Sequence, residues 1–154
     1  MGETRTAYSR QRDTEQAMSQ ENVEIVRRAY QAAARRDASA AIALYGSEVE
    51  WDVSHAPARD LLGEPHIYHG HVGLQRFFRA WYEAWEHVEP DLEELIAADE
   101  HVISVETTRG RGRASGAEVE LPHFAVWTIR HGKIDRVVWF GTREDALEAA
   151  GLSE

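Results

Sequence analysis

Hydrophobic residues recur at intervals of three to four in three parts of the chain, which is the spacing of helices that bury one face. The first part predicts a helix over residues 19–36, with Ser19 as its N-terminal cap. Asp37 can cap a short second helix that Gly46 would end, so these two helices form a hairpin. A third helix is predicted from Gly70 onward, and its apolar side contains Val72, Phe77, Phe78, Trp81 and Trp85.

Strict alternation of apolar and polar residues predicts strands in the remaining segments. The first strand is short, with Val49, Trp51 and Val53 on its buried side. The segment that follows, residues 54–66, is long for a compact domain and is a candidate lid. After Pro90 the pattern predicts antiparallel strands over residues 92–98, 101–108, 118–130 and 133–140, and then a helix over residues 143–150 capped by Thr142.

This order of elements is typical of an α+β domain in which helices gather on one face of a curved antiparallel sheet. The chain has 154 residues, enough for one domain with a sizeable core. Residues 1–18 carry polar and charged groups without periodicity, so we expect a mobile leader followed by a domain over residues 19–154. The broad sheet face that the helices leave uncovered predicts a homodimer.

Charge and composition exclude several classes of function. With 27 acidic against 17 basic residues, the formal charge of −10 repels phosphate backbones and lipid head groups, so neither a nucleic acid nor a membrane is an expected partner. The absence of cysteine excludes disulfides, thiolate metal sites and a cysteine nucleophile. The longest apolar stretch, residues 40–45, is far shorter than a membrane span. We therefore expect a cytoplasmic protein, and the preference for arginine over lysine is typical of a GC-rich bacterial genome.

Aromatic residues of the predicted helices and strands favour a pocket for a small hydrophobic molecule. In the strand over residues 118–130, Leu121, His123, Ala125 and Trp127 project to one side. The candidate ligand-binding residues are Trp51, Trp81, Trp127, Trp139 and Phe77. The alternative is that these rings simply fill the core.

Three polar residues are candidates for catalysis. His123 lies between apolar neighbours on an inward face, where it can serve as a general acid or base or as a hydrogen-bonded part of the core. Asp52 can shuttle a proton if it faces an apolar cavity, although the alternation of its strand places it on the exposed side. The phenol of Tyr30 can donate to a developing oxyanion or be an ordinary core tyrosine.

Two further groups of residues invite a functional reading. His55, His66, His69 and His71 precede or enter the third helix, but no acidic ligand follows closely, so loop and capping roles are favoured and no metal or other cofactor is expected. The run Arg-Gly-Arg-Gly-Arg at residues 109–113 looks like an RNA-binding motif, yet it falls where a hairpin tip is needed. A solvated turn is the better interpretation.

The order and spacing of several short segments resemble the SnoaL-like branch of the nuclear transport factor 2-like superfamily. These segments are residues 26–30 (VRRAY), 36–37 (RD), 49–51 (VEW), 68–78 (YHGHVGLQRFF), 126–134 (VWTIRHGKI) and 143–152 (REDALEAAGL). The resemblance implies a cystatin-like cone, in which a strongly bent antiparallel sheet wraps around a long helix, often as a dimer. The superfamily includes polyketide cyclases, ketosteroid isomerases, dehydratases, epoxide hydrolases and binding modules, so the fold alone does not assign a function.

Compared with the ketosteroid isomerases of this superfamily, the chain agrees only in part. Asp52 falls near the proton-shuttling aspartate, but Tyr30 is one helical position away from the isomerase tyrosine, about 100° around the axis. Phe124 stands where the neutral carboxylic acid of the oxyanion hole is found. Many SnoaL-like proteins have a histidine at the position of Ala125, and His123 lies two residues earlier on the same face.

The leading hypothesis is a cofactor-free acid–base enzyme that acts on a small hydrophobic, carbonyl-bearing molecule in a cyclisation, isomerisation or dehydration. Asp52 or His123 would remove a proton next to the carbonyl, and Tyr30 or the other member would stabilise the enolate oxygen. The alternative is a ligand-binding or assembly module that keeps the cone without chemistry.

Overall fold

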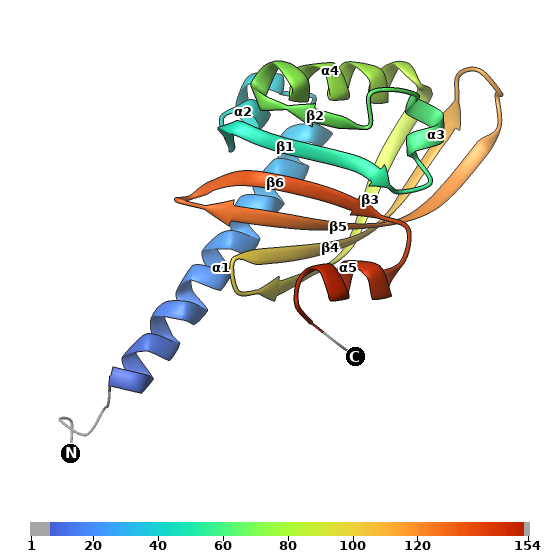
Figure 1. The fold of residues 1–154 in the computed structure, drawn as a ribbon. Helices are drawn as coiled ribbons and strands as arrows, with labels where there is room; N and C mark the ends of the chain where they lie inside the picture. Colours follow the sequence, from blue (N-terminus) through green and yellow to red (C-terminus); the bar gives the residue numbers. More distant parts are fainter. Residues whose placement is uncertain (1–6, 153–154) are drawn as a thin grey trace.

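The computed structural model of the protein describes residues 7–152, which form a curved sheet with helices on both faces (Figure 1). The helices are α1 (Ala7–Ala34), α2 (Ala38–Ile42), α3 (Arg59–Leu62), α4 (Gly70–Glu83) and α5 (Arg143–Ala149). The strands are β1 (Tyr45–His55), β2 (Ile67–His69), β3 (Trp85–Ala98), β4 (His101–Gly112), β5 (Glu118–Arg130) and β6 (Lys133–Phe140). The predicted α+β class is confirmed.

The six strands form one sheet in the order β2-β1-β6-β5-β4-β3. The last four strands of the chain pair antiparallel with their neighbours, as predicted from the tight turns between them. The expectation of a wholly antiparallel sheet needs one correction, because β1 pairs with β6 in parallel, with Trp51 opposite Val137. Parallel neighbours need a long crossover, and here half of the chain, residues 56–132, lies between these two strands.

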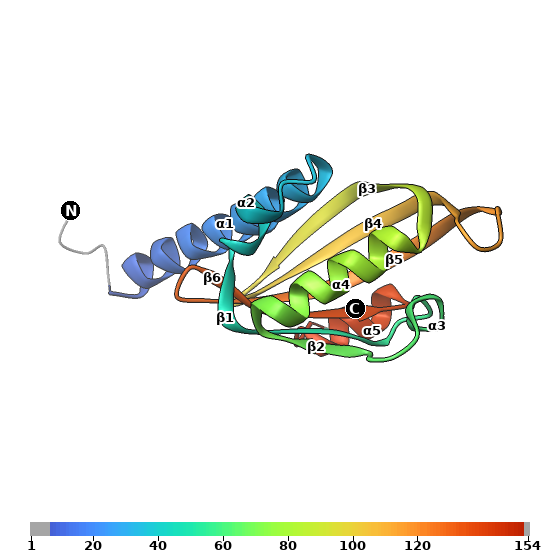
Figure 2. The same cartoon turned by 90° about the horizontal axis from the view of Figure 1, so that it is seen from above.

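The sheet curls around α4, and α1 lies along the same concave side (Figure 2). Leu74 and Phe77 of α4 and Val26 of α1 join the strands in the larger hydrophobic core. The last helix, α5, lies on the outer face, where it packs in a separate core that contains Ala98, Ile103, Val126, Ala146, Leu147 and Ala150. The helices therefore gather on the concave face except for α5, which covers part of the face predicted to be bare.

Several predicted boundaries are wrong. The first helix begins at Ala7 rather than Ser19, and the side chains from Thr14 to Met18 are exposed. The proposed mobility of the leader stays a prediction, and residues 1–6 lie outside the described part of the chain. Gly46 lies inside β1 instead of ending the second helix, although the caps predicted at Asp37 and Thr142 are confirmed.

Trp85 belongs to β3 and not to the third helix, although it lies four residues after Trp81. Its ring packs on β4 at Gly110, where an added Cβ would lie 2.8 Å from the ring atom Cε3 and 2.6 Å from the carbonyl oxygen of His87. The close approach of β3 to β4 therefore depends on a glycine at position 110. Trp81 and Trp85 are four residues apart, as on one face of a helix, but α4 ends at Glu83 and the chain turns at Ala84 before Trp85.

Candidate active site

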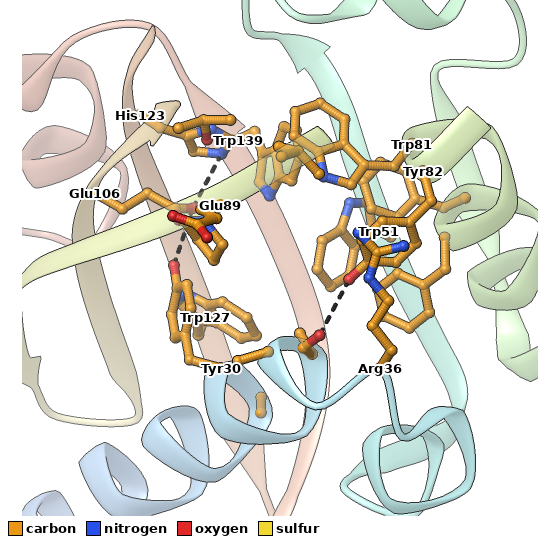
Figure 3. Close-up of a pocket in the computed structure, with 18 of the residues that line it drawn as sticks. Tyr30, Arg36, Trp51, Trp81, Tyr82, Glu89, Glu106, His123, Trp127 and Trp139 are labelled. Atoms are coloured by element: carbon orange, nitrogen blue, oxygen red, sulfur yellow. Dashed lines mark hydrogen bonds and ion pairs between the residues drawn. The ribbon is translucent and has the colours of Figure 1, made fainter. Parts of the chain in front are cut away.

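A cavity of about 320 Å³ opens between α1, α4 and the concave face of the sheet (Figure 3). The predicted ligand-binding residues Trp51, Trp81, Trp127, Trp139 and Phe77 all line it, and so do Tyr30 and His123. The other lining residues are Ala29, Ala33, Ala34, Arg36, Tyr45, Phe78, Tyr82, Val88, Glu89, Pro90, Glu106 and Thr108. Residues 54–66, the predicted lid, do not contribute to this lining. The size suits a small organic molecule, and the ligand-binding role of these residues stays a prediction.

One wall of the cavity is a cluster of aromatic rings centred on Trp51. The ring of Trp51 lies 4.7 Å from that of Phe77 and 5.8 Å from those of Trp127 and Trp139, measured between centroids. Trp81 continues the wall at 5.1 Å from Trp139. Most of these contacts are tilted or edge-to-face, which is the preferred geometry of packed rings. The indole Nε1 of Trp51 is buried without a hydrogen-bond partner.

The opposite end of the cavity carries a carboxyl group that the sequence analysis did not select. Glu106 of β4 lies directly opposite His123 of β5 in the strand register, so both side chains project from the same face. Both are buried, with His123 Nε2 3.7 Å from Glu106 Oε1, and this nitrogen has no hydrogen-bond partner. Tyr30 reaches the pair from α1, with its hydroxyl 3.1 Å from Glu106 Oε1.

Four side chains form a chain of hydrogen bonds that ends on Glu106. Trp127 donates from Nε1 to Ser104 Oγ over 2.8 Å, and Ser104 Oγ lies 2.9 Å from the hydroxyl of Tyr30. Because Tyr30 has a single hydroxyl proton, all contacts are satisfied when Ser104 donates to Tyr30 and Tyr30 donates to Glu106. The network therefore holds the phenol as a donor aimed at the carboxylate.

The buried setting moves the pKa values of these groups in opposite directions. Burial raises the pKa of Glu106 to about 7, and the hydrogen bond from Tyr30 only partly offsets this effect. Burial lowers the pKa of His123 to about 3, so its imidazole is neutral at pH 7 and its contact with Glu106 is not an ion pair. Burial, and then the nearby charge of Glu106, raise the pKa of Tyr30, which keeps the phenol protonated.

Asp52 is buried but does not line the cavity. Its Oδ1 accepts hydrogen bonds from the backbone N–H of Ser54 at 2.8 Å and from the Ser54 hydroxyl at 2.6 Å. Its Oδ2 lies 3.8 Å from His55 Nε2. The alternation of β1 places it on the outer face beside Val138 of β6, opposite to the face of Trp51. The structure thus does not bring Asp52 and His123 together.

The histidines before the third helix have separate local partners. His71 Nε2 donates to the carbonyl oxygen of Tyr45 over 2.9 Å, and His55 stacks on Phe140 with ring centroids 5.4 Å apart. His69 is the residue that precedes the first turn of α4. Within residues 7–152, no group of three or more potential metal-ligating side chains converges on one point.

The arginines of the glycine-rich run are engaged within their own sheet. Arg109 forms ion pairs with Asp91 and Glu120 on the two neighbouring strands. Arg111 pairs in the same way with Glu86 and Glu118. These contacts neutralise Arg109 and Arg111, whereas the third arginine of the run, Arg113, donates to backbone carbonyl oxygens. The predicted solvated turn is wrong for residues 109–112, because they belong to β4 and the turn begins at Arg113. The part of the chain that the structure describes has no helix long and apolar enough to cross a membrane.

The alternation of β4 alone does not point to Glu106. The apolar Ile103 and Val105 alternate with the polar Ser104 and Glu106, a pattern that would place the carboxyl on the exposed side. The structure instead buries both faces of this part of the strand. The signal that could have found Glu106 is the pairing of the two strands across the glycine-rich hairpin, which places it opposite the inward-facing His123.

Comparison with known proteins agrees with this architecture. A model of the SnoaL-like domain matches residues 26–137, and no curated protein sequence matches the chain. An NTF2-like protein of unknown function from Burkholderia pseudomallei superposes with a TM-score of 0.70 at 22% identity, covering 83% of this chain and 95% of that one. TerC co-crystallised with polyporic acid gives 0.69 at 21% identity, with coverages of 85% and 98%. A protein with a ketosteroid isomerase-like fold from Catenulispora acidiphila, in complex with trimethylamine, gives 0.64 at 16%, with coverages of 84% and 93%.

Proposed function

From the premise that the chain belongs to the SnoaL-like domain family, we propose that it binds a small hydrophobic, carbonyl-bearing molecule in the cavity and moves a proton next to the carbonyl without a cofactor. The reaction class is isomerisation, cyclisation or dehydration. Glu106 replaces Asp52 as the acid–base group of this proposal, because Glu106 lines the cavity and Asp52 does not.

The observation that carries the proposal is the pKa of Glu106, raised by burial to about 7 in a cavity that also holds the phenol of Tyr30 and the imidazole of His123. A group with a pKa near the working pH is present in both protonation states, so it can take a proton and give it back. Glu106 accepts a hydrogen bond from one donor, the phenol of Tyr30. A buried carboxylate with a purely structural role would be stabilised by additional donors, which would keep its pKa low.

The arrangement supports the following proton transfer. Carboxylate Glu106 removes a proton from the carbon next to the carbonyl, and the electron pair of the broken C–H bond moves onto the carbonyl oxygen as an enolate. Tyr30 and neutral His123 lie 3.1 and 3.7 Å from the Glu106 carboxyl oxygen. Once Glu106 has taken the proton it no longer needs the hydrogen bond from Tyr30, so the phenol and the imidazole can donate to the enolate oxygen. The neutral acid then returns the proton to the same or another carbon.

Structures of the same fold give this proposal general support. TerC is co-crystallised with polyporic acid, and the Catenulispora protein is in complex with trimethylamine, so both hold small molecules. At identities of 21% and 16%, these likenesses bear on the fold alone, and the chemistry is proposed from the residues of this chain.

Exchange of hydrogen for deuterium next to a carbonyl tests the proposal without knowledge of the natural substrate. In D₂O, with 2-tetralone as a hydrophobic ketone probe, NMR should show that the protein accelerates loss of the C1 proton signal. Glu106→Gln should lower this acceleration by about a hundredfold or more while the probe still binds, because removal of a positioned base has this effect. Binding without exchange in the unaltered protein would favour the alternative of a non-catalytic ligand-binding module.

We also propose that the protein forms a homodimer through the outer face of its sheet. Phe124 and Phe140 lie there only half-buried, next to the small core under α5. Light scattering at micromolar concentration should give about twice the mass of one chain, and a monomer would contradict the proposal. A cytoplasmic location stays a prediction from the sequence.

A further inference from the structure

A second cavity of about 180 Å³ adjoins the first, next to the end of α1, α2 and α4. Four residues line both cavities: Ala33, Arg36, Phe78 and Tyr82. The guanidinium of Arg36 lies 4.3 Å above the centre of the Tyr82 ring, and the Tyr82 hydroxyl donates to the carbonyl oxygen of Ala33 over 3.4 Å. Figure 3 shows the Tyr82 hydrogen bond at the edge of the first cavity. Because Arg36 and Tyr82 line both cavities, the two cavities meet at this pair of side chains.

The second cavity contains two arginines whose charges are not neutralised by an ion pair. Arg36 and Arg79 both line it, and within residues 7–152 neither forms an ion pair with a carboxylate. The single acidic residue of the lining, Asp37, accepts a hydrogen bond from the backbone N–H of Ala40 and so caps α2. Arg36 and Arg79 are exposed. Arg109 and Arg111 of β4, which are exposed as well, do find acidic partners in this acidic chain.

Apart from Arg36, the charged side chains that line the first cavity are acidic. Its acidic lining residues are Glu89 and Glu106, whereas its single cationic residue is Arg36, at the boundary. An anionic group of a ligand is therefore repelled from the sheet side and attracted toward Arg36 and Arg79. The apolar aromatic wall lies between these two ends.

We propose that the second cavity binds an anionic group of the ligand, such as a carboxylate, while the hydrophobic body fills the first cavity. Arginine suits this task because its planar guanidinium donates two parallel hydrogen bonds to such a group. This inference rests on the proposed function and narrows its substrate class to hydrophobic carbonyl compounds that also bear a negatively charged group. Such a charge at the second cavity would direct the opposite end of the molecule toward Glu106.

Two fluorescent probes of nearly equal shape test the inference. 8-Anilinonaphthalene-1-sulfonate carries a sulfonate, and N-phenyl-1-naphthylamine is the same molecule without it. Affinities of both are measured for the full chain and for Arg79→Gln, Arg36→Gln and the double variant. Arg76→Gln is the matched control, because Arg76 is an exposed arginine of the same helix, α4, that lines neither cavity.

The double variant should bind the sulfonate probe about tenfold more weakly, the scale of a lost charge-assisted contact, and the neutral probe with unchanged affinity. Arg79→Gln alone should show part of this loss, which guards against a change of fold caused by removing Arg36 from the Tyr82 ring. Equal losses for both probes, an unchanged affinity ratio, or the same loss in Arg76→Gln would overturn the inference while leaving the first cavity as a ligand site. Failure of both probes to bind the unaltered protein would contradict the proposed function itself.

Discussion

Asp52 and Glu106 are two carboxyl groups that the same sheet buries in different ways. Asp52 is 3% exposed and Glu106 is 6% exposed, so burial alone does not distinguish them. Asp52 lies on the outer face and receives two hydrogen bonds from Ser54, one of them from the backbone. Glu106 lies on the concave face, where a cavity adjoins it and the phenol of Tyr30 is its hydrogen-bond donor.

The difference shows that the donors around a buried carboxyl group, and the space beside it, decide what the group can do. The two hydrogen bonds from Ser54 hold the Asp52 side chain against the end of β1. Glu106 has too few donors to compensate for its burial, so its pKa rises to about 7. The free space of the cavity then allows a substrate to reach it. We expect acid–base chemistry at Glu106 and a structural role for Asp52.

The largest expected effect is a difference in turnover between two matched substitutions. Glu106→Gln should lower proton exchange by about a hundredfold or more, because glutamine cannot accept the proton. Asp52→Asn should leave exchange within about twofold of the unaltered protein, since this side chain does not touch the cavity. Both variants are measured under the same conditions with 2-tetralone, and a larger loss in Asp52→Asn would reverse our assignment of roles.

The pKa of Glu106 also predicts how stability depends on pH. The folded protein holds this proton with a pKa of about 7, above the ordinary value of 4.5, so it binds more protons than the unfolded chain between these values. The free energy of unfolding should therefore fall as the pH rises through this window, by about 3 kcal/mol from this group. Above pH 7 the loss is complete.

Urea unfolding at pH 5 and pH 8 measures this contribution when Glu106→Gln is compared with the unaltered protein. The variant lacks the titrating group, so its stability relative to the unaltered protein should be greater at pH 8 than at pH 5. His123 acts in the opposite direction, because its lowered pKa removes stability on acidification below 6.5. Since both proteins keep His123, the comparison isolates Glu106, and an equal difference at both pH values would refute the shift.

A smaller effect is expected from Tyr30→Phe, which removes the hydrogen bond to Glu106. This hydrogen bond lowers the pKa of Glu106, so its loss should raise that pKa further and move the pH–rate profile of exchange to higher pH. Turnover at neutral pH should fall about tenfold, because a donor for the enolate oxygen is also lost. Tyr45→Phe is the control: Tyr45 lines the same cavity without a hydrogen bond to Glu106, and its profile should not move.

The smallest effect concerns the stability of the outer carboxylate. Asp52→Asn retains an oxygen for Ser54 but removes the charge that strengthens both hydrogen bonds. The free energy of unfolding should drop by about 1 kcal/mol at pH 7, the difference between charged and neutral hydrogen bonds. No loss in urea unfolding would show that the charge of Asp52 contributes nothing to the fold.

Much of the fold follows from periodicity, because each long element buries one regular face. The alternation of β5 correctly directed His123 and Trp127 to the same side, and the spacing around Phe77 found α4. The error at Trp85 has a physical reason: four-residue spacing continues the helical pattern, and only the contact with Gly110 on a distant strand shows where the helix must end.

The candidate site was less predictable, because it depends on pairing between strands. The catalytic role of Asp52 was predicted from the resemblance to ketosteroid isomerases, although the alternation of its own strand already placed it on the outer face. Glu106 shares one face of β4 with Ser104 and Thr108, and its importance becomes clear only when the register sets it opposite His123 and α1 brings Tyr30 to it. Local pattern gives the face of a residue, and tertiary packing gives its partners.

The most direct test of the account is the titration of Glu106 itself. The protein is labelled with ¹³C at the glutamate carboxyl carbons, and the Glu106 signal is assigned by its absence in Glu106→Gln. Its chemical shift is then followed by NMR from pH 4 to pH 9. We predict a midpoint near the pKa of about 7 that burial produces. A midpoint close to the ordinary value of 4.5 would contradict the account, because Glu106 would then be an ordinary exposed-type carboxylate and a much weaker base for the C–H proton.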